Sequence, residues 1–166
     1  MANTNEYKNL EAACLNQFYK DQDLLKLDIR NAEQRKLFGK MELDIIGYSN
    51  RDKNLFLGEF TASGFFGLNG KDYHIGANRK LAESFLKLYI CRQKEGEIKK
   101  YFNEYRIDKI RYIFAVPKGA LFLNGLTFQK EIFGLSFLEL KQIEINSESK
   151  DRLERSYKSA RAENKK

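Results

Sequence analysis

The chain has 166 residues, of which 42% are hydrophobic and 32% are charged, and its formal net charge is +7. This length is typical of one domain with its own core, and the composition excludes an intrinsically disordered chain. No apolar run reaches the roughly 18–20 residues of a membrane span, and the first residues lack the pattern of a signal peptide, so we expect a cytoplasmic protein outside the membrane. The positive charge favours a polyanionic partner, of which nucleic acid is the usual one.

Part of this positive charge belongs to the last residues of the chain. Residues 146–166 are rich in lysine and arginine and poor in large apolar residues. We therefore divide the chain into a domain over residues 1–145 and a basic tail over residues 146–166, which is helical or disordered. Cys14 and Cys91 lie far apart with no CxxC pattern, so we expect free, buried thiols and no zinc site.

The first half of the chain predicts one helix and then three strands. Apolar residues at helical spacing predict a helix over residues 5–19, with Glu11 at the edge of its apolar stripe. A first strand is expected within residues 24–29. Two β-prone runs, over residues 41–48 and 54–61, are separated by a polar turn and predict a hairpin.

The second half predicts an alternation of helices and strands after a glycine-rich loop over residues 62–76. The loop aromatics either plug the core or stack on bases. The expected elements are a helix over 77–93, a polar helical stretch over 95–106, a buried strand over 110–116, a short helix within 119–133 and a strand within 135–145. Such an alternation predicts an α/β fold with a central mixed sheet flanked by helices.

The helix over residues 77–93 has the clearest apolar pattern of the chain. Its buried stripe is expected to comprise Leu81, Ala82, Phe85, Leu88 and Tyr89. The far side of the same helix is expected to carry Lys80, Glu83 and Lys87.

Each strand of the predicted hairpin carries one acid among apolar residues, Asp44 in the first and Glu59 in the second. A buried acid is costly unless it is paired or binds a cation. Mg²⁺ uses one or two protein carboxylates together with water and substrate phosphates, and it can promote phosphodiester hydrolysis. The alternative is a structural ion pair with lysine or arginine. The metal interpretation would be wrong if the two acids faced opposite sides of the sheet, or if a basic side chain were locked between them.

Residues 41–61, with the helices before and after them, resemble the core of the PD-(D/E)xK nuclease superfamily. In that family a helix bears an acid, a strand bears Asp, and its hairpin partner bears Glu-x-Lys; Glu11, Asp44 and Glu59 match the three acids. The resemblance implies a restriction-endonuclease-like three-layer sandwich and a restriction- or repair-type endonuclease that cleaves DNA with Mg²⁺ or Mn²⁺. It implies metal ligands from both strand acids and the carbonyl of Phe60, while Glu11 would hold a metal-bound water or a second ion. A homodimer, common among such enzymes, is one option.

The sequence departs from the family at the motif lysine, where Thr61 stands. Threonine can position water but carries no charge to stabilise the transition state. Lys71, in the glycine-rich loop, has the reach to replace the lysine. Lys80 is expected to point away from the core, and Lys40 lies at the far end of its strand; each of the three is more often a surface lysine.

This departure keeps two other functions open. One is a catalytically impaired DNA-binding module on the same fold, and the other is a protein-interaction subunit whose acids form ion pairs. The only histidine, His74, could contact a phosphate or move a proton, although a single loop histidine is more often structural.

Overall fold

The computed structural model describes residues 4–27, 38, 42–66, 74–135, 137–148, 150–152 and 154–155. In chain order its elements are α1 (Thr4–Asp21), β1 (Leu25–Lys26), β2 (Ile45–Ser49), β3 (Asn54–Phe60), α3 (Ile75–Gln93), α4 (Glu95–Tyr101), β4 (Lys109–Pro117), the 3₁₀ turns η1 (Leu121–Leu123) and η2 (Phe128–Lys130), α5 (Glu131–Leu135) and β5 (Leu138–Ile143).

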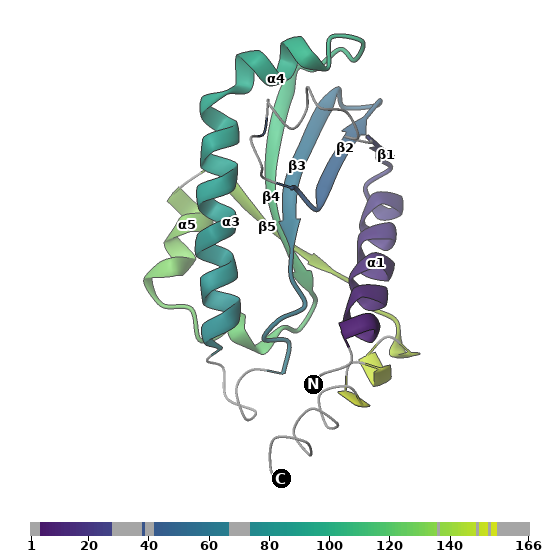
Figure 1. The fold of residues 1–166 in the computed structure, drawn as a ribbon, viewed down its shortest axis with the longest axis vertical. Coiled ribbons are helices and arrows are strands. Elements are labelled where there is room, and N and C mark those ends of the chain that lie inside the picture. Colours follow the sequence, from purple (N-terminus) through teal and green to yellow (C-terminus); the bar gives the residue numbers. More distant parts are fainter. Residues whose placement is uncertain are drawn as a thin grey trace.

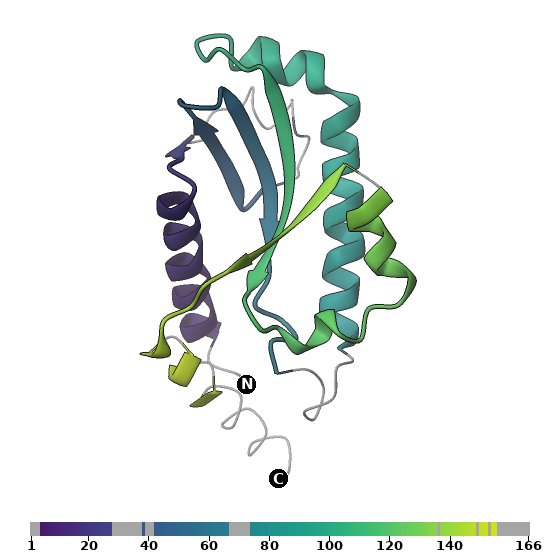
Figure 2. The same ribbon diagram turned by 180° about the vertical axis from the view of Figure 1, so that it is seen from behind.

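The five strands form one open, mixed sheet with the order β1-β2-β3-β4-β5. The first three strands are antiparallel neighbours, whereas β3, β4 and β5 are parallel. Parallel neighbours need a crossover, and α3 with α4 provides it between β3 and β4. Figure 1 shows α3 running along one face of the sheet and α1 beside its β1–β2 edge, and Figure 2 shows the same sheet from behind. The predicted α/β class with a mixed sheet is confirmed.

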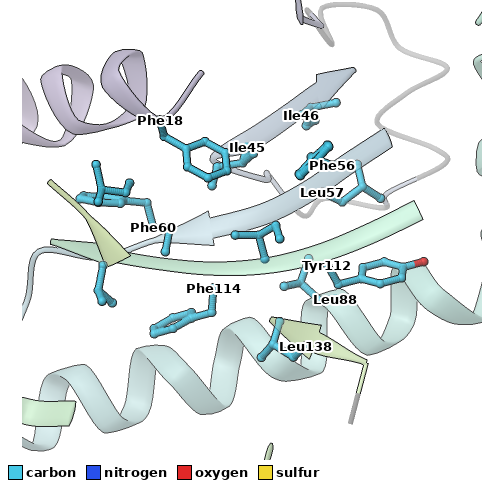
Figure 3. Close-up of a cluster of buried hydrophobic side chains, with 14 of the residues drawn as sticks. Phe18, Ile45, Ile46, Phe56, Leu57, Phe60, Leu88, Tyr112, Phe114 and Leu138 are labelled. Carbon is cyan, nitrogen blue, oxygen red and sulfur yellow. The ribbon is translucent and has the colours of Figure 1, made fainter. Parts of the chain in front are cut away.

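Buried apolar side chains from the strands and from both long helices form the core, as Figure 3 shows. The inner strand β4, which pairs with β3 and β5, is buried from Tyr112 to Pro117, as expected for a strand covered on both faces. Phe114 of this strand and Leu88 of α3 are fully buried in the same cluster. Removal of this apolar surface from water is the main stabilising contribution to the fold.

Helix α1 is fixed to the start of β2 by Tyr19. Its hydroxyl donates to the carbonyl of Ile46 at 3.1 Å and accepts from the backbone N–H of the same residue at 2.8 Å. The close approach requires glycine at position 47, because a Cβ there would lie 2.9 Å from the Tyr19 ring. Tyr19 therefore caps the edge of β2 where the short strand β1 does not reach, and Glu11 lies about two helical turns before it in α1.

The segment over residues 119–133 differs from the single short helix that the sequence predicts. It forms two 3₁₀ turns before α5 begins. The backbone N–H groups of Leu121 and Phe122, at the start of η1, donate to the carbonyls of Phe65 and Gly64. The loop after β3 therefore satisfies N–H groups that a helix start leaves free.

Both cysteines behave as the sequence predicts: Cys14 and Cys91 are free and buried. Burial raises the pKa of each thiol to about 11, so neither thiol is readily ionised. In the part of the chain that the structure describes, no helix combines the length and the apolar character needed to cross a membrane.

Candidate functional site

The two strand acids meet at one end of the hairpin. Asp44 lies at a bend directly before β2 rather than inside the strand, and the pairing of Ile45 with Gly58 places it level with Glu59. One oxygen of Asp44, Oδ2, accepts the backbone N–H of Phe60 at 2.9 Å. Opposed residues of antiparallel strands share a face, so both carboxylates lie on the face that α3 covers.

Glu59 is the most unusual side chain of the site, because it is an acid with no exposed surface. Its Oε2 accepts from the ammonium groups of Lys80 and Lys87 at 2.9 and 3.0 Å. Its Oε1 has no hydrogen-bond partner among the described residues. Two cations thus compensate the buried charge on one side, while the other oxygen stays unsatisfied.

The two lysines extend the site in different directions. The ammonium group of Lys80 also lies 3.7 Å from Oδ2 of Asp44, so it contacts both acids. The ammonium group of Lys87 also donates to the carbonyl of Glu42 at 3.3 Å. Both lysine side chains keep 31% of their surface exposed.

The expectation that Lys80 and Lys87 lie on the far side of α3 is therefore wrong. The buried residues of this helix are Ala77, Leu81, Ser84, Leu88 and Cys91. Tyr89, assigned to the stripe from the sequence, is 45% exposed. The helix is rotated so that Lys80 and Lys87, two turns apart on one face, both reach Glu59, which needs cationic partners.

The placement of Lys80 bears on both conditions set for a metal site. Asp44 and Glu59 lie on the same face of the sheet, as a shared cation requires. Lys80 lies between them, and a structural ion pair would use the same contacts. A 2.9 Å hydrogen bond to Glu59 holds Lys80 in this position, although 31% of its side chain is exposed, so the second condition favours a structural ion pair unless the ammonium group moves. The ion pairs are thus compatible with either a structural role or a site in which the lysine can move.

Glu11 of α1 completes the group of acids. It is partly buried, and it accepts a backbone hydrogen bond from Ala62, the second residue after β3. Burial and, next, the charge of Asp44 raise the pKa of Glu11, while Lys80 and the Ala62 hydrogen bond act in the opposite direction. The rise reflects burial of the Glu11 carboxyl and, next, the negative charge of Asp44, so Glu11 lies on the Asp44 side of the site.

Thr61 lies two residues after Glu59, at the position of the motif lysine, and it is buried and forms a local hydrogen bond. Thr61 is 3% exposed, and its Oγ1 accepts the backbone N–H of Ser63 at 3.1 Å. Its hydroxyl hydrogen remains available for donation. Phe60 donates its N–H toward the β2 side, and in an extended strand its carbonyl points to the same side. The predicted candidates Lys71 and Lys40 lie outside the described residues.

His74 begins α3 instead of lining the acids. It is the N-cap residue of this helix, and its Nδ1 accepts the backbone N–H of Ala77 at 3.0 Å. This contact satisfies one of the free N–H groups at the helix start. This N-cap contact supports a structural role for His74.

The acids fit a hard divalent cation with few protein ligands. Within the described residues, no three side chains of histidine, cysteine, aspartate or glutamate are close enough together to hold a metal ion. Mg²⁺ needs only one or two carboxylates, because waters and substrate phosphates complete its shell. Oε1 of Glu59 and the carboxylate of Asp44 provide such oxygens.

Comparisons with protein-family models, with curated proteins and with solved structures found no match for this chain.

Proposed function

We propose that the chain is a metal-dependent endonuclease of the PD-(D/E)xK type, which hydrolyses phosphodiester bonds of DNA. One observation carries the proposal: Glu59 is fully buried beside Asp44, with one carboxylate oxygen bound by two lysines and the other without a hydrogen-bond partner among the described residues. A cation bound to that second oxygen would satisfy it.

Asp44, Oε1 of Glu59 and the carbonyl of Phe60 would hold Mg²⁺ or Mn²⁺. When bound, such an ion activates water and neutralises charge on the phosphate. Lys80 would take the electrostatic role of the motif lysine, because it extends from α3 to both carboxylates and can therefore reach a phosphate bound next to them. Glu11, which lies near Asp44 and Ala62, would hold a metal-bound water or a second ion.

The arrangement of elements gives independent support. Helix α1, which bears Glu11, precedes the antiparallel β2–β3 hairpin, whose one end carries Asp44 and Glu59. Helix α3 and the parallel strand β4 follow. This order agrees with a restriction-endonuclease-like core. The net charge of +7 favours a polyanionic substrate, since every phosphate of a nucleic acid is negative.

The test is cleavage of supercoiled, linear and single-stranded DNA with Mg²⁺ or Mn²⁺, by wild type, Asp44→Ala and Asp52→Ala. Asp52 is the matched control, because it is an acid in the turn of the same hairpin and its carboxylate accepts hydrogen bonds from Ser49 and Arg51. We expect Asp44→Ala to lower the cleavage rate about 100-fold or more and Asp52→Ala to leave it within about twofold. Absence of metal-dependent cleavage by wild type, or equal loss in both variants, contradicts the proposal.

The second candidate is a DNA-binding module without catalysis. The two lysines that neutralise Glu59, together with Thr61 at the motif position, favour it. Such a module binds DNA with an affinity that falls steeply with salt and is unchanged by Asp44→Ala or by metal. Absence of both DNA and metal binding would instead favour a protein-interaction subunit.

A further inference from the structure

The two lysines at Glu59 make different second contacts. Lys80 approaches a second carboxylate, that of Asp44, at 3.7 Å. Lys87 donates instead to a neutral backbone carbonyl, that of Glu42, at 3.3 Å. An ammonium group has three donor hydrogens, so each lysine can make both contacts at once.

The contacts of Lys87 join two separate segments of the site. Glu59 lies near the end of β3, and Glu42 lies two residues before Asp44 in the segment that leads into β2. Lys87 therefore connects the carboxylate of one predicted ligand to the backbone that carries the other. Since a carbonyl is neutral, a cation bound near Asp44 does not compete for this contact.

A bound cation would act differently on Lys80. Its ammonium group lies beside both carboxylates that a divalent cation would use, and the positive charge of that cation would repel the ammonium group. When Lys80 moves away, Glu59 still has Lys87 as a cationic partner at Oε2. The carboxylate thus never becomes an uncompensated buried charge.

We propose that Lys87 is a positioning residue that keeps Glu59 oriented for the metal ion, while Lys80 is the lysine that leaves the acids and contacts the substrate phosphate. This division of roles rests on the proposed nuclease function and adds to it a second lysine, outside the family motif. It explains why one buried acid has two lysines.

The test measures Mn²⁺ affinity by isothermal titration calorimetry, and metal-dependent DNA cleavage, for Lys87→Met, Lys80→Met and Lys99→Met. Lys99 is the matched control, because its ammonium group donates to a neutral backbone carbonyl, that of Asp108, at 2.9 Å. We expect Lys87→Met to weaken Mn²⁺ binding about 10-fold or more, as the loss of an outer-shell partner does. Excess Mn²⁺ should then restore its cleavage.

Lys80→Met should bind Mn²⁺ at least as tightly as wild type, because it loses a competing positive charge, and excess metal should not restore its cleavage. Lys87→Arg, which keeps charge and donors, should retain the affinity within a few-fold. Circular dichroism establishes that each variant is folded; if Lys87→Met is not, Lys87→Gln replaces it.

Equal Mn²⁺ affinity in Lys87→Met and Lys99→Met, with wild type binding the metal, overturns the role of Lys87 alone. Equal loss of affinity in Lys80→Met and Lys87→Met also overturns the division of roles. Wild type that neither binds Mn²⁺ nor cleaves DNA overturns the nuclease proposal and this inference together.

Discussion

Removal of the two lysines at Glu59 should cost stability in a strongly non-additive way. Each lysine makes one charge-assisted hydrogen bond to Oε2, at 2.9 Å for Lys80 and 3.0 Å for Lys87. Such bonds contribute about 1.5–3 kcal/mol, and the partial exposure of both lysines favours the lower end of that range. We therefore expect a loss of about 1.5 kcal/mol for Lys80→Met or Lys87→Met alone.

The double variant leaves Glu59 with neither lysine as partner. A fully buried charge that loses its partners destabilises a protein by about 3–5 kcal/mol. We expect the upper end of that range, about 5 kcal/mol, which exceeds the two single losses together. Glu59→Gln in the same background should recover most of the loss, because the amide carries no charge.

Urea unfolding at pH 7 measures these losses. Far-UV circular dichroism is the appropriate signal, since the chain has no tryptophan. Lys99→Met is the control, and its loss should stay within about 0.5 kcal/mol. If the losses of Lys80→Met and Lys87→Met simply add, or if Glu59→Gln does not rescue the double variant, then Glu59 is not the buried charge that both lysines compensate.

Three further predictions concern other titratable or capping groups. Burial and, next, a neighbouring acid raise the pKa of Glu11. The stability linked to this carboxyl is therefore present below its unfolded pKa and is lost as pH rises through its folded pKa. Glu11→Gln should raise the melting temperature at pH 7, and a series of melts at decreasing pH should show this gain vanishing below about pH 4. The hydrogen bond from Arg111 lowers the pKa of Glu139, so the linked stability is present at neutral pH and is lost as pH falls through the folded pKa of the carboxyl. Glu139→Gln should cost about 0.5–1 kcal/mol of unfolding free energy at pH 7. Urea unfolding at decreasing pH should show that cost disappearing. His74→Ala should cost about 1 kcal/mol of unfolding free energy through loss of the cap on Ala77, while His74→Asn should retain most of it; equal losses would show that the cap contributes little.

The sequence was sufficient for the parts of the fold that local patterns control. Two β-prone runs with a polar turn between them predicted the hairpin, and its register brings Asp44 level with Glu59. The acids could be identified because a carboxylate in an apolar strand is costly and therefore informative. Glu11 was identified in the same way, from its position at the edge of an apolar stripe.

The cations of the site could not be found from periodicity. The helical spacing of apolar residues assigned Ala82, Phe85 and Tyr89 to the buried stripe of α3. Tyr89 is instead 45% exposed. The true orientation depends on a contact between distant parts of the chain, the one between Glu59 and α3. One signal was available: Lys80 and Lys87 are seven residues apart, two helical turns, and so lie on one face of the helix.

The lysines of α3 show how the charge of the motif can be kept while its sequence position changes. In Glu-x-Lys the lysine follows the acid by two residues and shares its face of the strand. Thr61 occupies that place here, buried and bound to the N–H of Ser63. Lys80 reaches the same carboxylate from the helix that covers this face. In the proposed nuclease an ammonium group must be within reach of the acids, and any element that packs on this face can supply it. The motif position is then free to become a buried, neutral residue.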